Sequence, residues 1–292
     1  MRMHDDEVDT DVALVGLLLA RQFPEWAGLP AVPVPSYGTD HDVYRLGDRL
    51  VVRLPRIGWA AGQAEKEARW LPRLAPRLPL AVPVPLAVGR PDDGYPFPWA
   101  VHEWLPGADA STAPFDPQQA AVDLAEFVLA LRAVDPADAP ATPAVRLADR
   151  DADVRRCVRE LGTRIDADAV LRLWERFLAA PAHGGDGRWI HGDLLLGNLL
   201  VVDGRLSAVI DWGGLAVGDP ASDLKPAWTV LSGSSREVFL DRVDADDAAR
   251  ERARGWALSQ ALIALPYYWR TNTGMVRQAR RSLEELAADV GR

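Results

Sequence analysis

The sequence contains only one cysteine, Cys157, among its 292 residues. A single thiol excludes an internal disulfide framework, and no Cys/His pattern has the spacing of a zinc site. We therefore expect a protein that folds without covalent or zinc cross-links. The reducing cytoplasm is the compartment that this composition favours.

Long hydrophobic runs and basic clusters are also missing. The longest apolar run near the start, residues 12–20, is too short to span a bilayer, follows an acidic segment and precedes no small-residue cleavage site. The chain has 33 Lys and Arg against 42 Asp and Glu, and its net charge is -9. These features argue against a membrane or nucleic acid as partner and mildly favour a cationic small molecule. They leave the oligomeric state open.

The first hundred residues alternate short strand patterns with turn signals. "AVPVPSYG" and "HDVYRL" flank a turn at Gly38, and a two-residue turn at Gly47 and Asp48 leads into "RLVVRL". Residues 63–74 have the apolar spacing of a helix, although Pro72 is expected to end or kink its last turn. "LAVG" and "WAVHEW" predict two further strands. We therefore expect a small lobe, residues 1–103, with a β-meander and one helix.

The remainder, residues 104–292, is predicted to be a larger and mainly helical lobe. Asp116 precedes a proline and a long helical pattern as an N-cap, and Asp151 and Asp166 are expected to cap two more helices. A hairpin closed by Asp203 and Gly204 is embedded among the helices, since "DG" between apolar strands is a strong turn signal. Together the two lobes predict an α+β fold.

Four polar residues lie on or beside this hairpin, and three interpretations compete for them: His191, Asp193, Asn198 and Asp211. A His-x-Asp iron site would need a second histidine downstream, but no histidine follows. In the second interpretation the carboxylates and the amide only shape turns. In the third they form a phosphoryl-transfer centre, which needs a base for the attacking hydroxyl and oxygen ligands for Mg²⁺.

The third interpretation is favoured when the residues are taken together. Asp193 is suited to accept the hydroxyl proton, and Asn198 to lend a side-chain oxygen to Mg²⁺. The hairpin then returns the chain, so that Asp211 can reach the same ion from a neighbouring strand.

The pair "HGDLLLGN" and "VIDWG", extended by "GDPASDL", resembles the H-x-D-x-x-x-x-N and D-x-G motifs of the kinase superfamily. The form is that of aminoglycoside and macrolide phosphotransferases and their choline-kinase-like relatives, and the resemblance covers most of the chain. It implies a two-lobed, protein-kinase-like fold with Asp193 as catalytic base and Asn198 and Asp211 as Mg²⁺ ligands. His191 is expected to support the loop rather than to act as the base.

The sequence departs from the family at the strand lysine that normally contacts the nucleotide phosphates. The chain has only two lysines: Lys66 lies in the predicted helix and Lys225 follows the last motif. The third strand instead offers Arg53, whose planar fork can hold phosphate or carboxylate, and macrolide phosphotransferases are similar in having an arginine-bearing "R-x-P-R" strand. Glu67 is the expected helix partner of Arg53, and Glu65, on a different face, is the second choice.

The expected phosphate-covering loop, "PSYGTDHDVYRL", has a single glycine. Ser36, Thr39 and backbone N–H groups are its candidate donors. Between the lobes, backbone groups from Glu103 to Leu105 are expected to contact the purine of ATP or GTP, and Trp104 to line that pocket or the core.

These features predict a Mg²⁺-dependent O-phosphotransferase that moves the γ-phosphate of ATP or GTP to a small-molecule hydroxyl. An aminoglycoside- or macrolide-type acceptor is implied by the resemblance, with a cellular amino-alcohol or sugar as the alternative. A non-catalytic pseudokinase is disfavoured because all three motif residues are present. A polycation would be gathered by acidic side chains, and a macrolide by apolar and aromatic ones. The acidic candidates are Asp193, Asp219, Asp223 and the carboxylates from Asp241 to Glu285, and the apolar candidates lie in residues 256–269.

Overall fold

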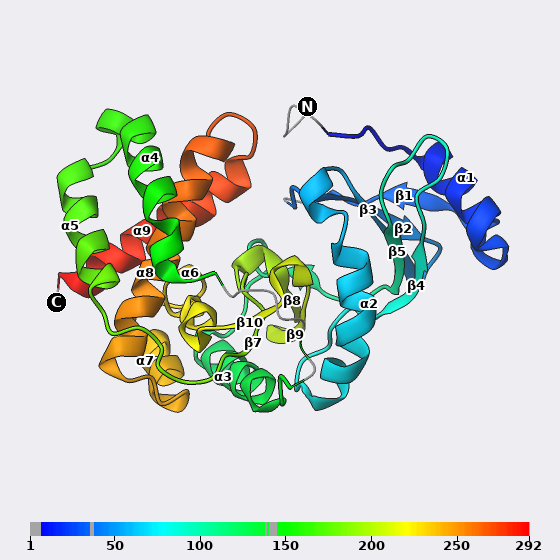
Figure 1. Cartoon of the computed structure of the whole chain (residues 1–292). Coiled ribbons are helices and arrows are strands. Elements are labelled where there is room, and N and C mark those ends of the chain that lie inside the picture. The colour runs from blue at the N-terminus through cyan, green and yellow to red at the C-terminus, as the bar shows by residue number, and fades with distance from the viewer. Residues whose placement is uncertain (1–6, 36–37, 138, 140–144, 292) are drawn as a thin grey trace.

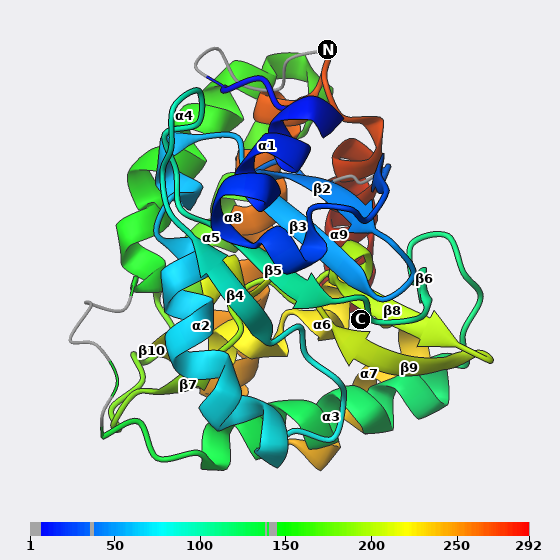
Figure 2. The ribbon, with the colours of Figure 1, turned by 90° about the vertical axis from the view of Figure 1, so that its right-hand side faces the viewer.

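The structure is a computed structural model that describes residues 7–35, 38–137, 139 and 145–291. Its N-terminal part is an antiparallel sheet with strand order β1-β2-β3-β5-β4. Figure 2 shows α1 in front of this sheet and α2 beside β4. The elements are α1 (Val12–Gln22), β1 (Ala31–Pro33), β2 (His41–Leu46), β3 (Leu50–Pro55), α2 (Gln63–Leu74), β4 (Pro85–Gly89) and β5 (Trp99–Glu103).

A small hydrophobic core holds α1 against the sheet. Val15, Leu18 and Leu19 of α1 pack with residues of β2, β3 and β5 such as Val52. Trp99 enters this core across β4 at Gly89, where an added Cβ would lie 2.1 Å from the indole. Only glycine therefore allows the tryptophan to cross the neighbouring strand at this point.

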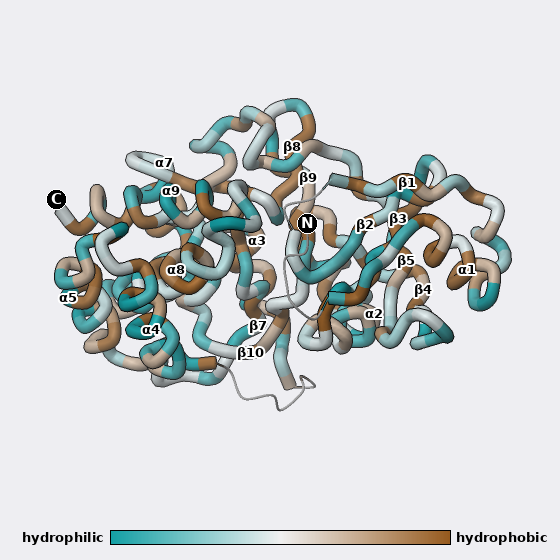
Figure 3. Tube along the Cα trace, turned by 90° about the horizontal axis from the view of Figure 1, so that it is seen from above, coloured by the Kyte–Doolittle hydropathy of each residue, from teal (hydrophilic) through white to brown (hydrophobic). Residues whose placement is uncertain are grey.

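The rest of the chain is mainly helical, with two small sheets (Figure 1). Its strands are β6 (Ala108–Asp109), β7 (Arg188–Ile190), β8 (Leu199–Val202), β9 (Arg205–Val209) and β10 (Ala216–Gly218). Its helices are α3 (Pro117–Ala133), α4 (Asp151–Leu161), α5 (Ala167–Leu178), α6 (Pro226–Thr229), α7 (Gly233–Arg242), α8 (Asp247–Tyr268) and α9 (Thr273–Val290). In Figure 3, α8 lies among α4, α5 and α9, against which it packs.

Local sequence signals account for several of these boundaries. Asp116 accepts hydrogen bonds from the first amides of α3, and Asp166 caps α5 in the same way. Asp203 and Gly204 both have positive φ, 50° and 77°, so the β8–β9 turn is the predicted two-residue turn.

Two local predictions are wrong. The β2–β3 connection has three residues, because Leu46 pairs with Leu50. Asp151 is the first residue of α4 rather than its cap, and its carboxylate accepts instead from Trp174 Nε1 at 2.8 Å. α2 spans the expected residues 63–74, with Pro72 in its last turn, and that turn packs against the larger core.

A larger hydrophobic core fills the helical part and also takes in Trp70, Leu71 and Leu74 of α2. The rings of Trp70 and Trp189 of β7 are 5.0 Å apart. Ala81, in the segment between α2 and β4, pairs with β9 at Ala208. α2 and the segment after it thus join the sheet to the hairpin. The lobe boundary between residues 103 and 104 stays a prediction.

No helix in the described ranges is long and apolar enough to cross a membrane.

Candidate active site

Two buried charged side chains, Asp223 and Lys225, hold the loop from His191 to Asn198 in place. Asp223 accepts the backbone N–H groups of His191 and Gly192 at 2.6 and 2.8 Å, and Lys225 Nζ donates to the Gly192 carbonyl at 2.6 Å. Gly192 has a φ of 81°, and an added Cβ would lie 2.7 Å from the Gly214 carbonyl oxygen. Asp223 therefore shapes the loop, and the expectation that it gathers a cationic acceptor is wrong.

His191 is fully buried and uses both ring nitrogens inside the protein. Its Nδ1 accepts from the Asp193 amide at 3.2 Å, so Nε2 carries the proton and donates to the Ile210 carbonyl at 3.1 Å. Burial lowers the pKa of the imidazole despite the nearby carboxylates of Asp223, Asp193 and Asp211. A neutral ring with both nitrogens engaged is a support for the loop.

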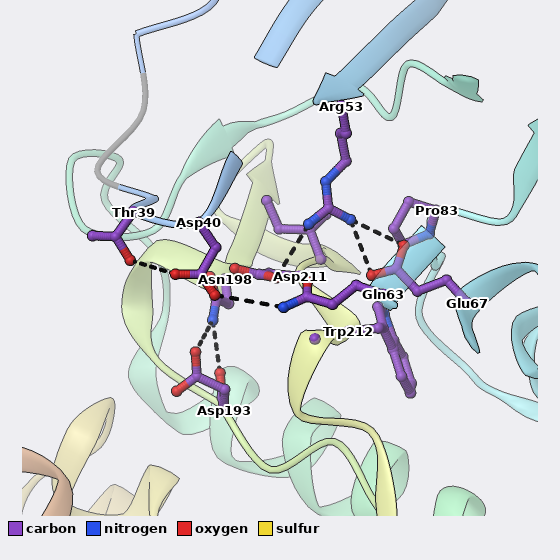
Figure 4. Close-up of polar contacts among 12 residues, drawn as sticks. Thr39, Asp40, Arg53, Gln63, Glu67, Pro83, Asp193, Asn198, Asp211 and Trp212 are labelled. Carbon is purple, nitrogen blue, oxygen red and sulfur yellow. Dashed lines mark hydrogen bonds and ion pairs between the residues drawn. The ribbon is translucent and has the colours of Figure 1, made fainter. Parts of the chain in front are cut away.

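The Asp193 carboxylate is held by two amides. Asn198 Nδ2 donates to Asp193 Oδ2 at 2.9 Å and to its backbone carbonyl at 2.8 Å (Figure 4). Gln260 Nε2, from α8, donates to Oδ1 at 2.5 Å. Burial raises the pKa of Asp193 although Lys225 opposes the shift. A carboxylate with a raised pKa, held in place by two amide donors, is suited to general-base chemistry.

Asp211 follows β9 by two residues and points toward the same region (Figure 4). Its backbone is left-handed, with φ 60° and ψ 75°, a conformation that non-glycine residues rarely adopt outside turns and functional sites. Oδ1 lies 3.2 Å from Nη2 of Arg53. Burial alone would raise the pKa of Asp211, but the Arg53 guanidinium and other nearby groups hold it below its ordinary value.

The same guanidinium links Asp211 to Glu67 on α2. Arg53 Nη1 lies 3.2 and 3.1 Å from the two carboxylate oxygens of Glu67, whereas Glu65 is exposed on another face of the helix. Burial raises the pKa of Glu67 more than Arg53 lowers it. Lys66 does not replace Arg53, because its Nζ donates to the Gly213 carbonyl at 2.5 Å. The structure thus places Arg53 between two carboxylates from different elements.

His102 of β5 is a buried neighbour of this ion pair that sequence reasoning missed. Its Nδ1 lies 2.9 Å from the Pro83 carbonyl, and its Nε2 lies 4.0 Å from Glu67 Oε2. Burial lowers the pKa of His102 to about 3. Within the strand pattern "WAVHEW", nothing distinguishes this histidine from an ordinary strand residue.

The phosphate-loop candidates lie at the open end of β2. Thr39 Oγ1 donates to Asp40 Oδ1 at 3.0 Å and accepts from the Tyr268 hydroxyl of α8 at 3.0 Å. Ser36 lies outside the described residues. The loop is therefore in contact with the end of a helix 229 residues further along the chain.

The junction after β5 orients the candidate purine-binding groups. The Trp104 amide donates to the Arg49 carbonyl at 2.7 Å, and Glu103 pairs with Leu50. Because backbone groups alternate sides along an antiparallel strand, the N–H and C=O groups of Glu103 point away from β3. Leu105 is the residue after Trp104. The guanidinium of Arg45 lies 4.0 Å from the centre of the Trp104 ring.

The acidic side chains expected to gather a polycation are largely engaged within the protein. Asp219 caps the short helix that begins at Pro220 and lies 2.7 Å from Arg252 Nε, so this expectation is also wrong for Asp219. Three further carboxylates of the helical region form ion pairs with arginines: Asp241 with Arg250, Glu251 with Arg176 and Arg254, and Glu285 with Arg236. Most of residues 256–265 belong to the core, whereas Tyr267 is 48% exposed.

A strand arginine paired with a helix glutamate, opposite an Asp–Asn loop and a strand-end Asp, is the arrangement of a kinase-like phosphotransferase. Sequence comparison agrees, because the model of the phosphotransferase enzyme family matches residues 32–256. The chain belongs to this family.

Solved structures confirm the kinase-like fold. The GDP complex of aminoglycoside 2′-phosphotransferase IIIa has a TM-score of 0.76 at 19% identity, over 96% of this chain and 100% of that one. Macrolide 2′-phosphotransferase MphH from Brachybacterium faecium has a TM-score of 0.64 at 26% identity, over 93% and 97%. The streptomycin–ATP complex of APH(2″)-IIa has a TM-score of 0.59 at 18% identity, over 87% and 90%. No curated protein matches the sequence.

Proposed function

We propose that this protein is a Mg²⁺-dependent O-phosphotransferase that moves the γ-phosphate of ATP or GTP to a hydroxyl of an aminoglycoside- or macrolide-type small molecule. The observation that carries the proposal is the convergence of Asp193, Asn198 and Asp211 with the Arg53–Glu67 pair in a member of the phosphotransferase family.

The nucleotide is assigned to the region between the sheet and the helical part, where Arg53 meets Asp211. Arg53 supplies a permanent cation for the phosphates, and Glu67 holds its guanidinium in place. Thr39 covers the phosphates from the β1–β2 loop, and Ser36 stays a prediction on that loop. Backbone groups of Glu103 and Leu105 contact the purine. Relatives solved with GDP and with ATP support a nucleotide donor and leave open whether its purine is guanine or adenine.

The oxygens of Asn198 and Asp211 fit a magnesium site. The side-chain nitrogen of Asn198 faces Asp193, so its Oδ1 points away from Asp193. Arg53 contacts Oδ1 of Asp211, which leaves Oδ2 of Asp211 as the candidate ligand. In the described ranges no three His, Cys, Asp or Glu side chains form a metal cage. One or two protein ligands completed by phosphates and water are usual for Mg²⁺. When bound there, the ion would neutralise charge on the phosphates.

Asp193 is assigned as the proton acceptor. The acceptor hydroxyl oxygen forms a bond to the γ-phosphorus as the bond from phosphorus to the β-phosphate oxygen breaks, and the hydroxyl proton passes to the carboxylate. Burial and the two donated amide hydrogen bonds keep the carboxylate in place beside the acceptor. Asp193 orients the hydroxyl before transfer and holds its proton afterwards.

Of the two acceptor types, the structure favours the macrolide type. Several of the carboxylates that would attract a polycation, among them Asp219 and Asp223, are paired with an arginine or with backbone amides. The rings of Tyr267 and Tyr268 lie 4.8 Å apart, and Tyr268 contacts the phosphate loop. An exposed tyrosine, Tyr267, packed against the half-buried Tyr268 at this position suits a large apolar ring better than it suits several ammonium groups.

A transfer assay tests the proposal. The purified protein with Mg²⁺ and either ATP or GTP is offered erythromycin, kanamycin, choline or glucose, and phosphorylated product is detected by mass spectrometry. We expect product with erythromycin, at a KM that changes little with salt. A polycation would bind through attraction screened beyond a Debye length of ~8 Å, so a KM that rises steeply with salt for kanamycin would reverse the acceptor assignment. Phosphorylation of choline or glucose alone would indicate a metabolic kinase, and no product with any compound would refute the proposal.

The metal assignment has a separate test. Mg²⁺ and nucleotide together should raise the melting temperature of the wild type more than nucleotide alone, because they bind only the folded state. Asp211→Asn should lose most of this additional, Mg²⁺-dependent shift. An equal Mg²⁺-dependent shift in the two proteins would remove Asp211 from the metal site.

Cytoplasmic location and the absence of a nucleic-acid partner stay predictions from the sequence.

A further inference from the structure

The candidate base is held by residues from two different parts of the chain. Asn198, which binds Oδ2, belongs to the same loop as Asp193, whereas Gln260, which binds Oδ1, lies 67 residues away on α8. With Oδ2 alone anchored, the carboxylate can still rotate about its Cβ–Cγ bond. Anchoring both oxygens fixes the carboxylate plane and therefore the direction in which a lone pair meets the acceptor hydroxyl.

The surroundings of Gln260 are mainly apolar, with Gln278 and Ser282 as the other polar side chains of the cavity. It lines a small cavity with Leu195, Met275 and three alanines of the same helix, Ala257, Ala261 and Ala264. Its Oε1 is buried and has no hydrogen-bond partner among the described residues. An amide buried with an unpaired oxygen destabilises the folded state, and an apolar side chain of similar length would avoid that penalty.

The orientation of this amide is set by Asp193. A carbonyl oxygen cannot form a hydrogen bond with a carboxylate oxygen, so Nε2 must face Oδ1 and Oε1 must face the apolar cavity. The hydrogen bond from Gln260 to Asp193 therefore leaves the Oε1 atom of Gln260 without a hydrogen-bond partner among the described residues. A side chain selected for packing alone would not have this arrangement.

We propose that Gln260 is a positioning residue that holds the Asp193 carboxylate in the orientation needed for proton acceptance. The inference rests on the proposed function, since it assigns a role at the same site. It also means that the orientation of the Asp193 carboxylate is set from α8, the helix whose last residue, Tyr268, contacts Thr39 of the phosphate loop. The acceptor-side helix thus contacts both the base and the loop over the nucleotide.

The test compares Gln260→Met with Gln278→Met. Methionine has nearly the same length as glutamine and no donor. Gln278, on α9, lines the same cavity but donates to the Thr229 carbonyl at 2.8 Å instead of to the base. Turnover with Mg²⁺, ATP and the acceptor found for the wild type, both KM values and the melting temperature are measured for each protein. A further variant is Gln260→Glu. It keeps the shape of the side chain but removes the amide group that donates to Asp193 Oδ1.

We expect Gln260→Met to lower kcat by about a hundred-fold, the effect of a small misplacement of a reacting group, with both KM values near those of the wild type. Its melting temperature should equal or exceed the wild-type value, because the unpaired oxygen is gone. Gln278→Met should keep kcat and melt lower. Gln260→Glu should lose kcat as Gln260→Met does.

Two results would overturn the inference. One is wild-type kcat in both Gln260 variants. The other is a loss of kcat in Gln260→Met that comes with a lower melting temperature and weaker nucleotide binding, which is the signature of a general structural role. A wild-type protein that transfers phosphate to no acceptor would instead refute the proposed function, so the two failures are distinguishable.

Discussion

The sheet and the helical region use their charged residues in different ways. On the sheet, Arg53 joins two carboxylates, Glu67 and Asp211, that lie 14 and 158 residues away in sequence. Asp211 still directs one oxygen toward the open site. In the helical region, carboxylates such as Asp219 and Asp289 are bound by arginines of neighbouring helices. A net negative charge therefore does not reveal which carboxylates a ligand can reach, because the arginines of the protein already bind many of them.

Asp193→Asn is expected to have the largest effect. Removing a positioned base lowers kcat by about a hundred- to ten-thousand-fold, while the phosphate contacts of Arg53 remain and nucleotide affinity stays near the wild-type value. Steady-state kinetics and nucleotide titration measure the two quantities. Asp219→Asn is the control from the helical region, and it should keep kcat because Asp219 is occupied with Arg252. Retained turnover in Asp193→Asn would show that the base is another group.

Arg53→Ala should produce the next largest effect, this time on stability. The substitution leaves Glu67, whose side chain is 2% exposed, and Asp211 without their shared counter-charge. Breaking a buried ion pair in this way lowers the free energy of unfolding by about 3–5 kcal/mol. Urea denaturation measures the loss, and adding Glu67→Gln to Arg53→Ala should recover part of it. An unchanged midpoint would mean that the two carboxylates are not stabilised by Arg53.

Asp289→Asn tests whether a paired carboxylate of the helical region contributes to stability rather than to chemistry. Burial would raise the pKa of Asp289, but hydrogen bonds and charge from Arg254, Trp228 and Arg236 hold it below its ordinary value of 3.8. Its stabilisation is therefore present at neutral pH and is lost as the pH falls through the lowered pKa. Glu67, whose pKa is raised, has the opposite pH dependence.

For Asp289→Asn we expect unchanged kcat and a free energy of unfolding at neutral pH about 1.5–3 kcal/mol lower, the range for hydrogen bonds to charged groups. Urea denaturation over an acidic pH series should show a smaller loss of stability in the variant than in the wild type. Identical pH profiles for the two proteins would contradict this role.

Tyr268→Phe is expected to have the smallest effect, and it tests the contact between the helical region and the phosphate loop. The variant loses one hydroxyl hydrogen bond to Thr39. Such a bond contributes about 0.5–1.5 kcal/mol, so the KM for nucleotide should rise by about two- to twelve-fold. Tyr267→Phe makes the same chemical change on the adjacent ring and should leave that KM unchanged. Equal KM values in both variants would show that the Tyr268 contact does not influence nucleotide binding.

Much of the fold could be predicted because its signals are local. Asp116 and Asp166 cap helices through amides a few residues away, and Asp203 with Gly204 closes a hairpin through its own backbone angles. A prediction fails where a distant partner competes. Asp151 accepts a hydrogen bond from Trp174 Nε1, 23 residues away, instead of capping its helix.

The sequence by itself determined the class of chemistry, since Asp193, Asn198 and Asp211 lie within one short motif whose loop and hairpin bring them together. Only the tertiary structure decided which polar and charged groups meet. It selected Glu67 over Glu65 as the partner of Arg53, paired Asp219 and Asp223 with groups inside the protein, and brought Gln260 to Asp193. The physical reason is distance along the chain: hydrogen bonds and ion pairs act over a few ångströms, so packing, which joins residues far apart in sequence, decides which partners meet.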